Sequence, residues 1–255
     1  MRKPKDTSWE SAEPWYQRCV GEKGHYYHQS IILPSILRLL QISKKTEGSL
    51  LDLGCGQGVL ARHLPEKINY VGVDSSPSLI RDAKKQTRME RCQFLAADAT
   101  KPLALEKKDF DWATFVLSLQ NMEDGKAALA NAGAHLKTGA QLLIILNHPC
   151  FRIPRQSSWE IDPKSQIQSR KMNCYMSPLK IPIQTHPGKG EKSDSTYSFH
   201  HPLSDYVAWI ASAQFAISAL EEWCSDKQSE GGKARMENRA RKEFPLFLAL
   251  LCKKL

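Results

Sequence analysis

The sequence predicts an α/β fold built on a mostly parallel sheet with helices on both faces. Two observations support this prediction. Continuous apolar runs alternate with amphipathic segments from residue 50 to residue 146, and a glycine-rich turn follows the first run at once. Runs of this kind are typical of strands that are buried on both faces of a parallel sheet. We expect seven strands, over residues 50–53, 70–74, 94–97, 111–119, 141–146, 215–223 and 246–252.

The glycine-rich turn lies in the segment Leu51 to Gly58, which reads LDLGCGQG. Because glycine lacks a Cβ atom, the chain can turn sharply there and a ligand can approach the backbone closely. The apolar residues that follow, Val59, Leu60 and Leu64, predict the opening of a helix. An acidic residue that ends the next strand, about 20 positions further on, is placed to accept hydrogen bonds from ribose hydroxyls. The segment therefore predicts a nucleoside-binding βαβ unit.

Asp74 is the acidic residue at the end of that second strand. An aspartate in this place could instead cap the next helix, because Asp and Ser both favour the capping position. Ser75 or Ser76, followed by Pro77, provides a better helix start. We therefore expect the helix to begin at the serines and Asp74 to be left for a ligand.

The spacing of the glycines distinguishes between kinds of nucleoside cofactor. A dinucleotide fingerprint has glycines at its first, third and sixth positions, whereas here the sixth position is Val59 and the third glycine stands at the fifth. The segment instead resembles the first motif of class I S-adenosylmethionine-dependent methyltransferases, acidic-x-Gly-x-Gly-x-Gly, on Asp52, Gly54, Gly56 and Gly58. The order of the strands and helices that follow is similar to that family as well.

This resemblance implies a Rossmann-like, seven-stranded fold with S-adenosyl-L-methionine as the cofactor. In the family, an aspartate after the third strand accepts a hydrogen bond from the adenine amino group, and small neighbours leave room for the ring. Asp98 and Ala99 match this pattern, and the backbone near Leu117 is expected to hold the methionine moiety. The cofactor contacts that the resemblance implies are Asp52, Gly54, Cys55, Gly56, Gln57, Asp74, Ser75, Asp98, Ala99, Leu117, Tyr27 and His28.

Residues 1–45 predict an N-terminal helical lid that precedes the core, with a strongly apolar helix at residues 31–40. The family resemblance makes Tyr16, Tyr27 and His28 candidates to close the methionine end of the pocket. An aromatic segment that simply packs on the sheet is the alternative. A lid would exclude water from the reacting groups.

Residues 46–255 are expected to form the methyltransferase core, with residues 147–202 as an insertion after the fifth strand. The insertion is rich in Pro, Ser, Gln and Lys, contains isolated aromatic residues and shows little periodicity. A loop of this length in a compact domain is usually functional or disordered. We interpret it as a substrate cap above the cofactor.

Two histidines are the candidate catalytic residues. His148 follows the fifth strand, at the carboxyl end of the sheet where open α/β folds bind their ligands, and His200 lies near the end of the insertion. An imidazole is well suited to remove a proton at physiological pH. A hydroxyl acceptor needs such a base, whereas an activated carbon beside a phenolate needs only positioning.

Composition narrows the class of partner. The chain of 255 residues carries a formal net charge of +9, and its basic residues are dispersed apart from a cluster at residues 231–242. Dispersed positive charge favours solubility or attraction of an anionic substrate over a nucleic-acid interface. The seven cysteines include no CxxC pair, which predicts a reduced, cytoplasmic compartment and no metal site. No apolar run approaches the roughly 20 residues of a membrane helix, and no secretory signal is expected.

We therefore expect a cytoplasmic enzyme that transfers a methyl group from S-adenosylmethionine to a hydroxyl or an activated carbon of a small molecule. The segments after residue 203 are similar to the last part of quinone and natural-product methyltransferases, although the signature segments of the quinone-ring enzymes are missing. The alternatives are a methyltransferase of RNA or protein, which a contiguous basic groove would favour, and a non-catalytic cofactor-binding protein. The sequence fixes neither the acceptor nor the oligomeric state.

Overall fold

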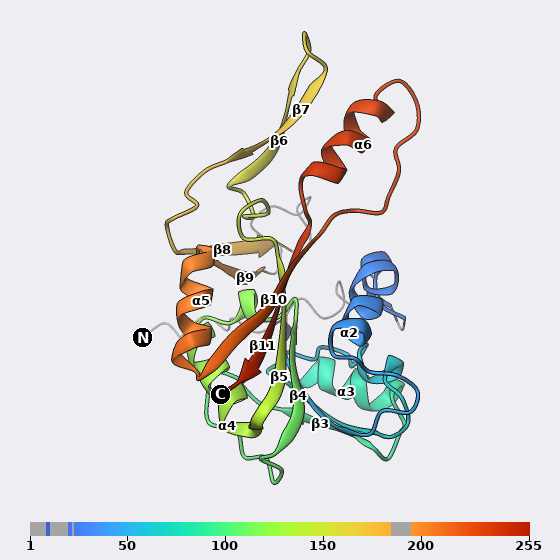
Figure 1. Ribbon diagram of the computed structural model, residues 1–255, viewed down its shortest axis with the longest axis vertical. Coiled ribbons are helices and arrows are strands. Elements are labelled where there is room, and N and C mark those ends of the chain that lie inside the picture. The colour runs from blue at the N-terminus through green and yellow to red at the C-terminus, as the bar shows by residue number, and fades with distance from the viewer. Residues whose placement is uncertain (1–8, 11–19, 22, 185–194) are drawn as a thin grey trace.

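The computed structural model describes residues 9–10, 20–21, 23–184 and 195–255 (Figure 1). Its central strands are β1 (Gly48–Leu53), β2 (Ile68–Asp74), β3 (Cys92–Ala96), β4 (Phe110–Val116), β5 (Leu136–Asn147), β10 (Phe215–Trp223) and β11 (Phe247–Lys254). They form a seven-stranded sheet in the order β10-β11-β5-β4-β1-β2-β3. β1 to β5 pair in parallel, whereas β11 is antiparallel to both β5 and β10. The predicted mostly parallel, seven-stranded sheet is confirmed.

Helices cover both faces of the sheet, as predicted (Figure 1). The first layer holds the π-helix η2 (His28–Ile32), α2 (Leu33–Leu39) and α3 (Pro77–Gln86), and the second holds α4 (Gly125–His135) and α5 (Leu203–Ser212). Strand β5 lies between them: Leu143 and Ile145 face the first layer, and Leu142 and Ile144 face the second. No helix in the described part of the chain is long and apolar enough to cross a membrane.

Local signals set where the helices begin. Ser76 caps α3, because its hydroxyl accepts a hydrogen bond from the Leu79 amide at 3.2 Å and Pro77 follows it, as predicted. Asp124 caps α4 in the same way, accepting from the Ala127 amide at 2.9 Å. α4 therefore begins at Gly125, after the short 3₁₀ helix η4 (Leu119–Asn121). α5 has no side-chain cap, because the residue at its N-cap position is Pro202.

The prediction of a helix after the glycine turn is wrong in the length of the helix. The segment forms only the 3₁₀ helix η3 (Ala61–His63), and then Leu64 adopts an extended conformation with ψ of 146°. Pro65 is the physical reason, because a proline disfavours the helical conformation of the residue before it. The apolar side chains of Val59, Leu60 and Leu64 are buried in the core as expected, but the backbone that carries them is a turn and not a longer helix.

The insertion is more regular than its sequence indicates, because it forms two β-hairpins. They pair β6 (Ser157–Asp162) with β7 (Ile167–Met172), and β8 (Leu179–Gln184) with β9 (Ser195–His200). The first extends away from the sheet and contacts α6 (Ala234–Glu243), the helix formed by the basic cluster (Figure 1). β6 and β7 lack apolar alternation because neither strand has a buried face, so periodicity did not reveal them.

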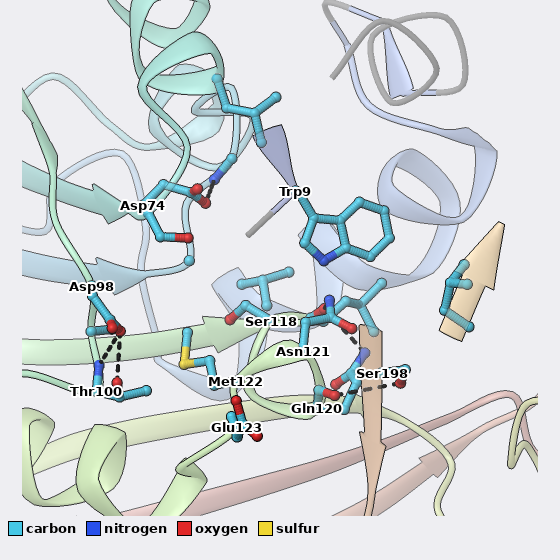
Figure 2. A pocket seen from close by; sticks show the side chains of 18 of the residues that line it. Trp9, Asp74, Asp98, Thr100, Ser118, Gln120, Asn121, Met122, Glu123 and Ser198 are labelled. Carbon is cyan, nitrogen blue, oxygen red and sulfur yellow. Dashed lines mark hydrogen bonds between the residues drawn. The ribbon is translucent and has the colours of Figure 1, made fainter. Parts of the chain in front are cut away.

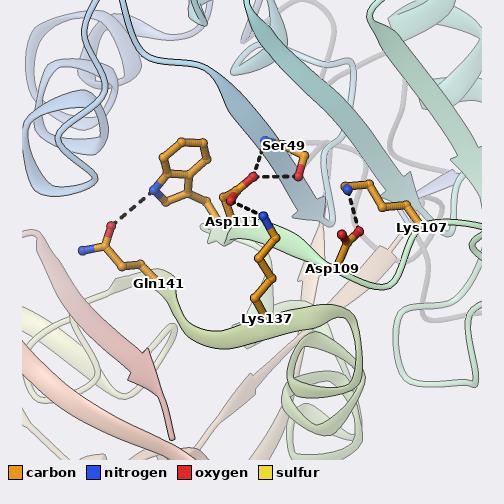
Figure 3. Close-up of polar contacts among 7 residues, drawn as sticks. Ser49, Lys107, Asp109, Asp111, Lys137 and Gln141 are labelled. Atoms are coloured by element: carbon orange, nitrogen blue, oxygen red, sulfur yellow. Dashed lines mark hydrogen bonds and ion pairs between the residues drawn. The ribbon is translucent and has the colours of Figure 1, made fainter.

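A polar cluster ties the strands together at the amino ends of β1, β4 and β5 (Figure 3). The Asp111 carboxylate accepts from the Ser49 amide and hydroxyl at 2.8 and 3.0 Å, and from the Lys137 ammonium at 2.7 Å. Burial works against ionisation here, but these donors outweigh it and lower the pKa of Asp111. The cluster lies at the edge of the sheet opposite the carboxyl ends of its parallel strands.

A second carboxylate lies inside the sheet. Asp52 on β1 is almost fully buried and accepts hydrogen bonds from the Tyr70 hydroxyl at 2.7 Å and the Thr114 hydroxyl at 2.8 Å. Burial raises the pKa of Asp52 to about 6, although both hydrogen bonds pull it down. The folded protein therefore binds this proton more tightly than the unfolded chain does.

This pKa predicts a specific pH dependence of stability. Because Asp52 titrates near 3.8 when unfolded and near 6 when folded, its contribution is most favourable below pH 4 and is lost as the pH rises through 6. We expect the free energy of unfolding of the wild type to fall by about 2 kcal/mol between pH 4 and pH 7 relative to Asp52→Asn. Urea unfolding of both proteins at the two pH values checks this, and parallel pH curves would contradict it.

Candidate functional site

A cavity of about 710 Å³ opens at the carboxyl ends of β1, β2, β4 and β5. This is the edge at which open α/β sheets bind their ligands. The residues that line it come from the strand ends and the loops after them, from the N-terminal region and from the insertion (Figure 2). Those from the strand ends include Gly54, Gly56, Asp74, Ser75, Asp98, Ala99, Leu117, Ser118 and Asn147.

The glycine turn forms one wall of the cavity. Gly54 and Gly56 have φ angles of 79° and 54°, a region that residues with a Cβ atom rarely adopt. The amides of Gly54 and Cys55 both donate to the Val73 carbonyl, at 2.7 and 3.0 Å. A Cβ atom on Gly54 would lie 2.3 Å from that of Ser118. The turn therefore requires glycine at position 54 both for its backbone angle and for space.

Asp74 projects into the cavity from the end of β2 (Figure 2). Its two carboxylate oxygens accept hydrogen bonds from the amides of Gly56 and Ser76, each at 2.9 Å. Burial raises the pKa of Asp74, although these two donors pull it down. The backbone thus fixes the carboxylate in one orientation, and its remaining lone pairs are suited to a pair of vicinal hydroxyls such as those of a ribose.

Asp98 stands on the same side of the cavity, after β3 (Figure 2). Its Oδ1 accepts from the amide and the hydroxyl of Thr100, at 2.9 and 2.7 Å. The small residues Ala97 and Ala99 border the cavity beside it. A carboxylate oxygen next to a space lined by alanines can accept from an amino group on a flat ring, which fits the expected adenine contact.

The chain leaves β4 through a strained residue. Leu117 has a φ of 54°, which is unusual for a residue with a Cβ atom, and it lines the cavity. Its amide donates to the Ile145 carbonyl at 2.9 Å. Its own carbonyl accepts from the side-chain amides of Gln120 and Asn121, at 3.0 and 3.1 Å. Such strain persists only where the surroundings hold it, and it is frequent at functional sites.

The N-terminal region closes part of the cavity. Glu10 accepts from the Ser76 and Ser78 hydroxyls, both at 2.5 Å, and from the Ser78 amide at 3.0 Å, so it is anchored at the start of α3. This contact places Trp9 over the cavity (Figure 2). The sequence did not indicate that Trp9 lines the cavity. Its neighbour Glu10 is anchored by Ser76 and Ser78, which lie far along the chain. Tyr16 lies outside the described residues.

His25 and His28 also line the cavity. Burial lowers the pKa of His28 to about 4, with a further contribution from the charges of His25 and His63. The imidazole of His28 is therefore neutral at physiological pH. Its Nδ1 is buried and has no hydrogen-bond partner among the described residues.

Eight of the twelve predicted cofactor contacts line the cavity, and the other four lie behind its walls. Asp52 lies inside the sheet, where its carboxylate accepts hydrogen bonds from Tyr70 and Thr114. Cys55 is buried, and burial raises the pKa of its thiol. Gln57 donates to the Gly21 carbonyl at 2.6 Å, and the Tyr27 hydroxyl contacts that of Ser225 at 2.9 Å. These four residues support the cavity from outside it.

The two predicted catalytic histidines are buried and do not line the cavity. Nε2 of His148 contacts Glu222 at 2.7 Å, and its Nδ1 accepts from the Cys150 amide. Nε2 of His200 donates to the Tyr175 carbonyl at 2.7 Å. Burial lowers the pKa of both imidazoles. A role as base requires a path to the cavity, and in this structure both rings have other partners.

The insertion forms the wall farthest from the glycine turn. Pro154, Ile183 and Ser198 line the cavity there. An ion pair between Lys180 on β8 and Glu123 after η4, with 2.8 Å between Nζ and Oε1, holds the second hairpin against η4. Part of the predicted cap is thus in contact with the site, whereas the first hairpin extends away from it (Figure 1).

Comparison with known proteins shows what the region around the glycine turn is similar to. A methyltransferase domain profile matches residues 50–139. A 2-phytyl-1,4-naphtoquinone methyltransferase of Nostoc punctiforme is 28% identical over 169 residues, which cover 63% of this chain and 66% of that protein. The chain spans about half the length of further curated relatives, which are uncharacterized methyltransferases of Mycobacterium with 31% identity over 97 residues.

Solved structures show the same fold. An S-adenosylmethionine-dependent methyltransferase of Mesorhizobium loti superimposes with a TM-score of 0.67 at 21% identity, covering 89% of this chain and 99% of that one. A glycopeptide N-methyltransferase, solved with S-adenosyl-L-methionine, superimposes with a TM-score of 0.55 at 15% identity. The superposition covers 88% of this chain and 93% of that one. The domain match, the glycine turn and this fold agree. Residues 50–139 therefore match a methyltransferase domain, and the chain has the fold of solved S-adenosylmethionine-dependent methyltransferases.

Proposed function

We propose that this protein transfers a methyl group from S-adenosylmethionine to a small molecule. One observation carries the proposal: a single cavity joins the cofactor wall at Gly54, Asp74 and Asp98 to a second wall formed by the insertion. A ligand at the first wall therefore shares one cavity with a molecule at the second. This arrangement supports direct transfer between the two, because aligned reactants in contact need little further organisation.

The proposed roles of the residues follow from their places. Asp74 and Asp98 bind the adenosine, and Leu117 with the glycine turn binds the methionine moiety. Trp9 covers the site and excludes water. The cofactor supplies a methyl group that its sulfonium already activates. His28 is the imidazole best placed to contact a hydroxyl acceptor, because it lines the cavity and its Nδ1 has no hydrogen-bond partner among the described residues, whereas its lowered pKa makes it a weak base.

A small acceptor is favoured over RNA or protein by the form of the site. The insertion and the N-terminal region both contribute walls to the cavity, which favours a molecule small enough to lie between them. The relative from Nostoc punctiforme is named for a naphthoquinone substrate, which supports an aromatic or polycyclic acceptor class. The six described cysteines are all free thiols, which supports the proposed cytoplasmic location.

The cofactor assignment predicts that Asp74→Ala loses affinity for S-adenosylhomocysteine at least tenfold. The variant removes hydrogen bonds to a charged group, which contribute about 1.5–3 kcal/mol each. Isothermal titration calorimetry measures the effect. Asp109→Ala is the matched control, because Asp109 is an exposed carboxylate paired with Lys107 outside the cavity. Equal affinity of Asp74→Ala and the control would refute the assignment, as would failure of the wild type to bind.

The lid role predicts that Trp9→Ala and Glu10→Gln each weaken cofactor binding by roughly three- to tenfold, in line with about 1 kcal/mol for one such contact. Neither substitution removes a side chain from the sheet, so the melting temperature should stay close to that of the wild type. Trp159→Ala is the control, since Trp159 lies on the first hairpin and is 41% exposed. Unchanged dissociation constants in both variants would count against the lid.

A further inference from the structure

Arg152 carries a guanidinium that makes no hydrogen bond or ion pair with the described residues. It stands where the chain passes from β5 into the first hairpin, and its side chain is accessible to solvent. Even so, burial by the surrounding protein lowers the pKa of Arg152, whereas the nearby Tyr27 raises it. A side chain that is accessible and yet partly desolvated lies in a concave part of the surface. Arg152 is therefore open to a ligand, and its charge is costly to leave without one.

Arg170 on β7 is held next to Arg152. Its Nε donates to the Phe151 carbonyl at 2.8 Å, and this carbonyl belongs to the peptide bond that precedes Arg152. Its Nη2 donates to the Ser157 hydroxyl at 2.6 Å, and the guanidinium lies 5.0 Å from the centre of the Trp159 ring. These contacts orient the guanidinium and leave Nη1 without a partner among the described residues. Burial lowers the pKa of Arg170, and the positive charge of Arg152 lowers it further.

The carboxylates of the first hairpin lie away from this pair of arginines. Trp159 pairs with Arg170 across the hairpin, and side chains alternate between the two faces of a strand. Glu160 and Asp162 are therefore on the face opposite Arg170, where Asp162 accepts from the Ser165 hydroxyl at the tip of the hairpin. No carboxylate in the described part of the chain contributes to the pKa of either arginine.

The loop after β10 adds a positive charge to this region. Lys227 places its ammonium 5.2 Å from the centre of the Tyr27 ring, and Tyr27 is the residue whose charge acts on Arg152. The neighbouring carboxylate of Asp226 accepts from the Tyr26 hydroxyl at 3.1 Å. Like charges that lie side by side repel, and a carboxylate or phosphate between them offsets both the repulsion and the cost of desolvation. The two arginines therefore have the charge and the unused donors of an anion site.

The pair of arginines adjoins the cavity. Asn147 and Pro154, on either side of Arg152 in the sequence, both line the cavity, and so does His28, which follows Tyr27. A molecule that occupies the cavity beside the insertion can therefore extend toward the guanidinium groups. Such groups bind carboxylate and phosphate with paired hydrogen bonds, which orient the ligand as well as attract it.

We propose that Arg152 and Arg170 bind a carboxylate or phosphate group of the methyl acceptor. This inference rests on the proposed function and narrows its substrate class to small molecules that carry an anionic group. The reacting atom lies in the cavity beside the cofactor, and the anionic group lies at the arginines. Both residues act by orienting the acceptor, and neither makes or breaks a bond.

The test uses three probes with the same rings: 2-naphthoate, 2-naphthyl phosphate and the neutral 2-naphthamide. Dissociation constants are measured by ligand-observed NMR at constant ionic strength, with saturating S-adenosylhomocysteine, for the wild type and Arg152→Gln. Arg235→Gln is the control, because it removes the same charge from an exposed arginine on α6 that does not act on Arg152 or Arg170. The measured quantity is the preference for each charged probe over 2-naphthamide.

We expect the wild type and the control to prefer at least one charged probe by roughly tenfold, in line with one charge-assisted contact, and Arg152→Gln to lose this preference. The probe with the larger preference distinguishes a carboxylate from a phosphate. Arg152→Lys keeps the charge but loses the planar fork, so it should recover only part of the preference. Because the Arg152 guanidinium has no partner among the described residues, Arg152→Gln should keep the wild-type melting temperature, which loss of a structural contact would lower.

Three results overturn the inference while the proposed function stands: a wild type without preference for either charged probe, a preference that Arg152→Gln retains, or an equal loss in Arg152→Gln and Arg235→Gln. A tenfold loss of S-adenosylhomocysteine affinity in Arg152→Gln also overturns it, because the anion held there would then be the carboxylate of the cofactor. Failure of the wild type to bind S-adenosylhomocysteine would instead overturn the proposed function. The cofactor titration, performed first on each protein, separates these cases.

Discussion

The site depends on one backbone contact, the pairing of the Gly54 and Cys55 amides with the Val73 carbonyl. This contact turns the chain at the end of β1 and brings it against the end of β2. The next residue after Val73 is Asp74, whose carboxylate accepts from the Gly56 amide of the same turn. The turn and the carboxylate therefore hold each other in place, and the rest of the cavity is arranged around them.

Segments distant in sequence complete the cavity through a few polar contacts. Glu10 binds the amino end of α3 and thereby positions Trp9, and the Lys180 ion pair with Glu123 positions the second hairpin. An exposed ion pair contributes little to stability, so these contacts define geometry more than they stabilise the fold. The sheet, by contrast, is held by the two apolar layers on either side of β5.

The core and the cofactor side of the site could be predicted because their signals are local. The apolar runs indicate the strands, and the first and second glycines are required by positive φ angles at 54 and 56. The first hairpin of the insertion could not be predicted, because exposed strands carry no apolar alternation. The short η3 was missed because one proline outweighed the helical pattern of Val59, Leu60 and Leu64.

The sequence by itself determined the fold class, the positions of the seven strands along the chain and the carboxylates Asp74 and Asp98 at the ends of two of them, because each follows from a residue and its neighbours along the chain. The tertiary structure decided which histidines, amides and aromatic residues meet in the cavity. His148 and His200 have partners elsewhere, whereas Trp9, His28 and Gln120 line the cavity. Such pairings join residues that are distant in the sequence, as far as 66 positions for Ser76 and Glu10, and no local pattern records them.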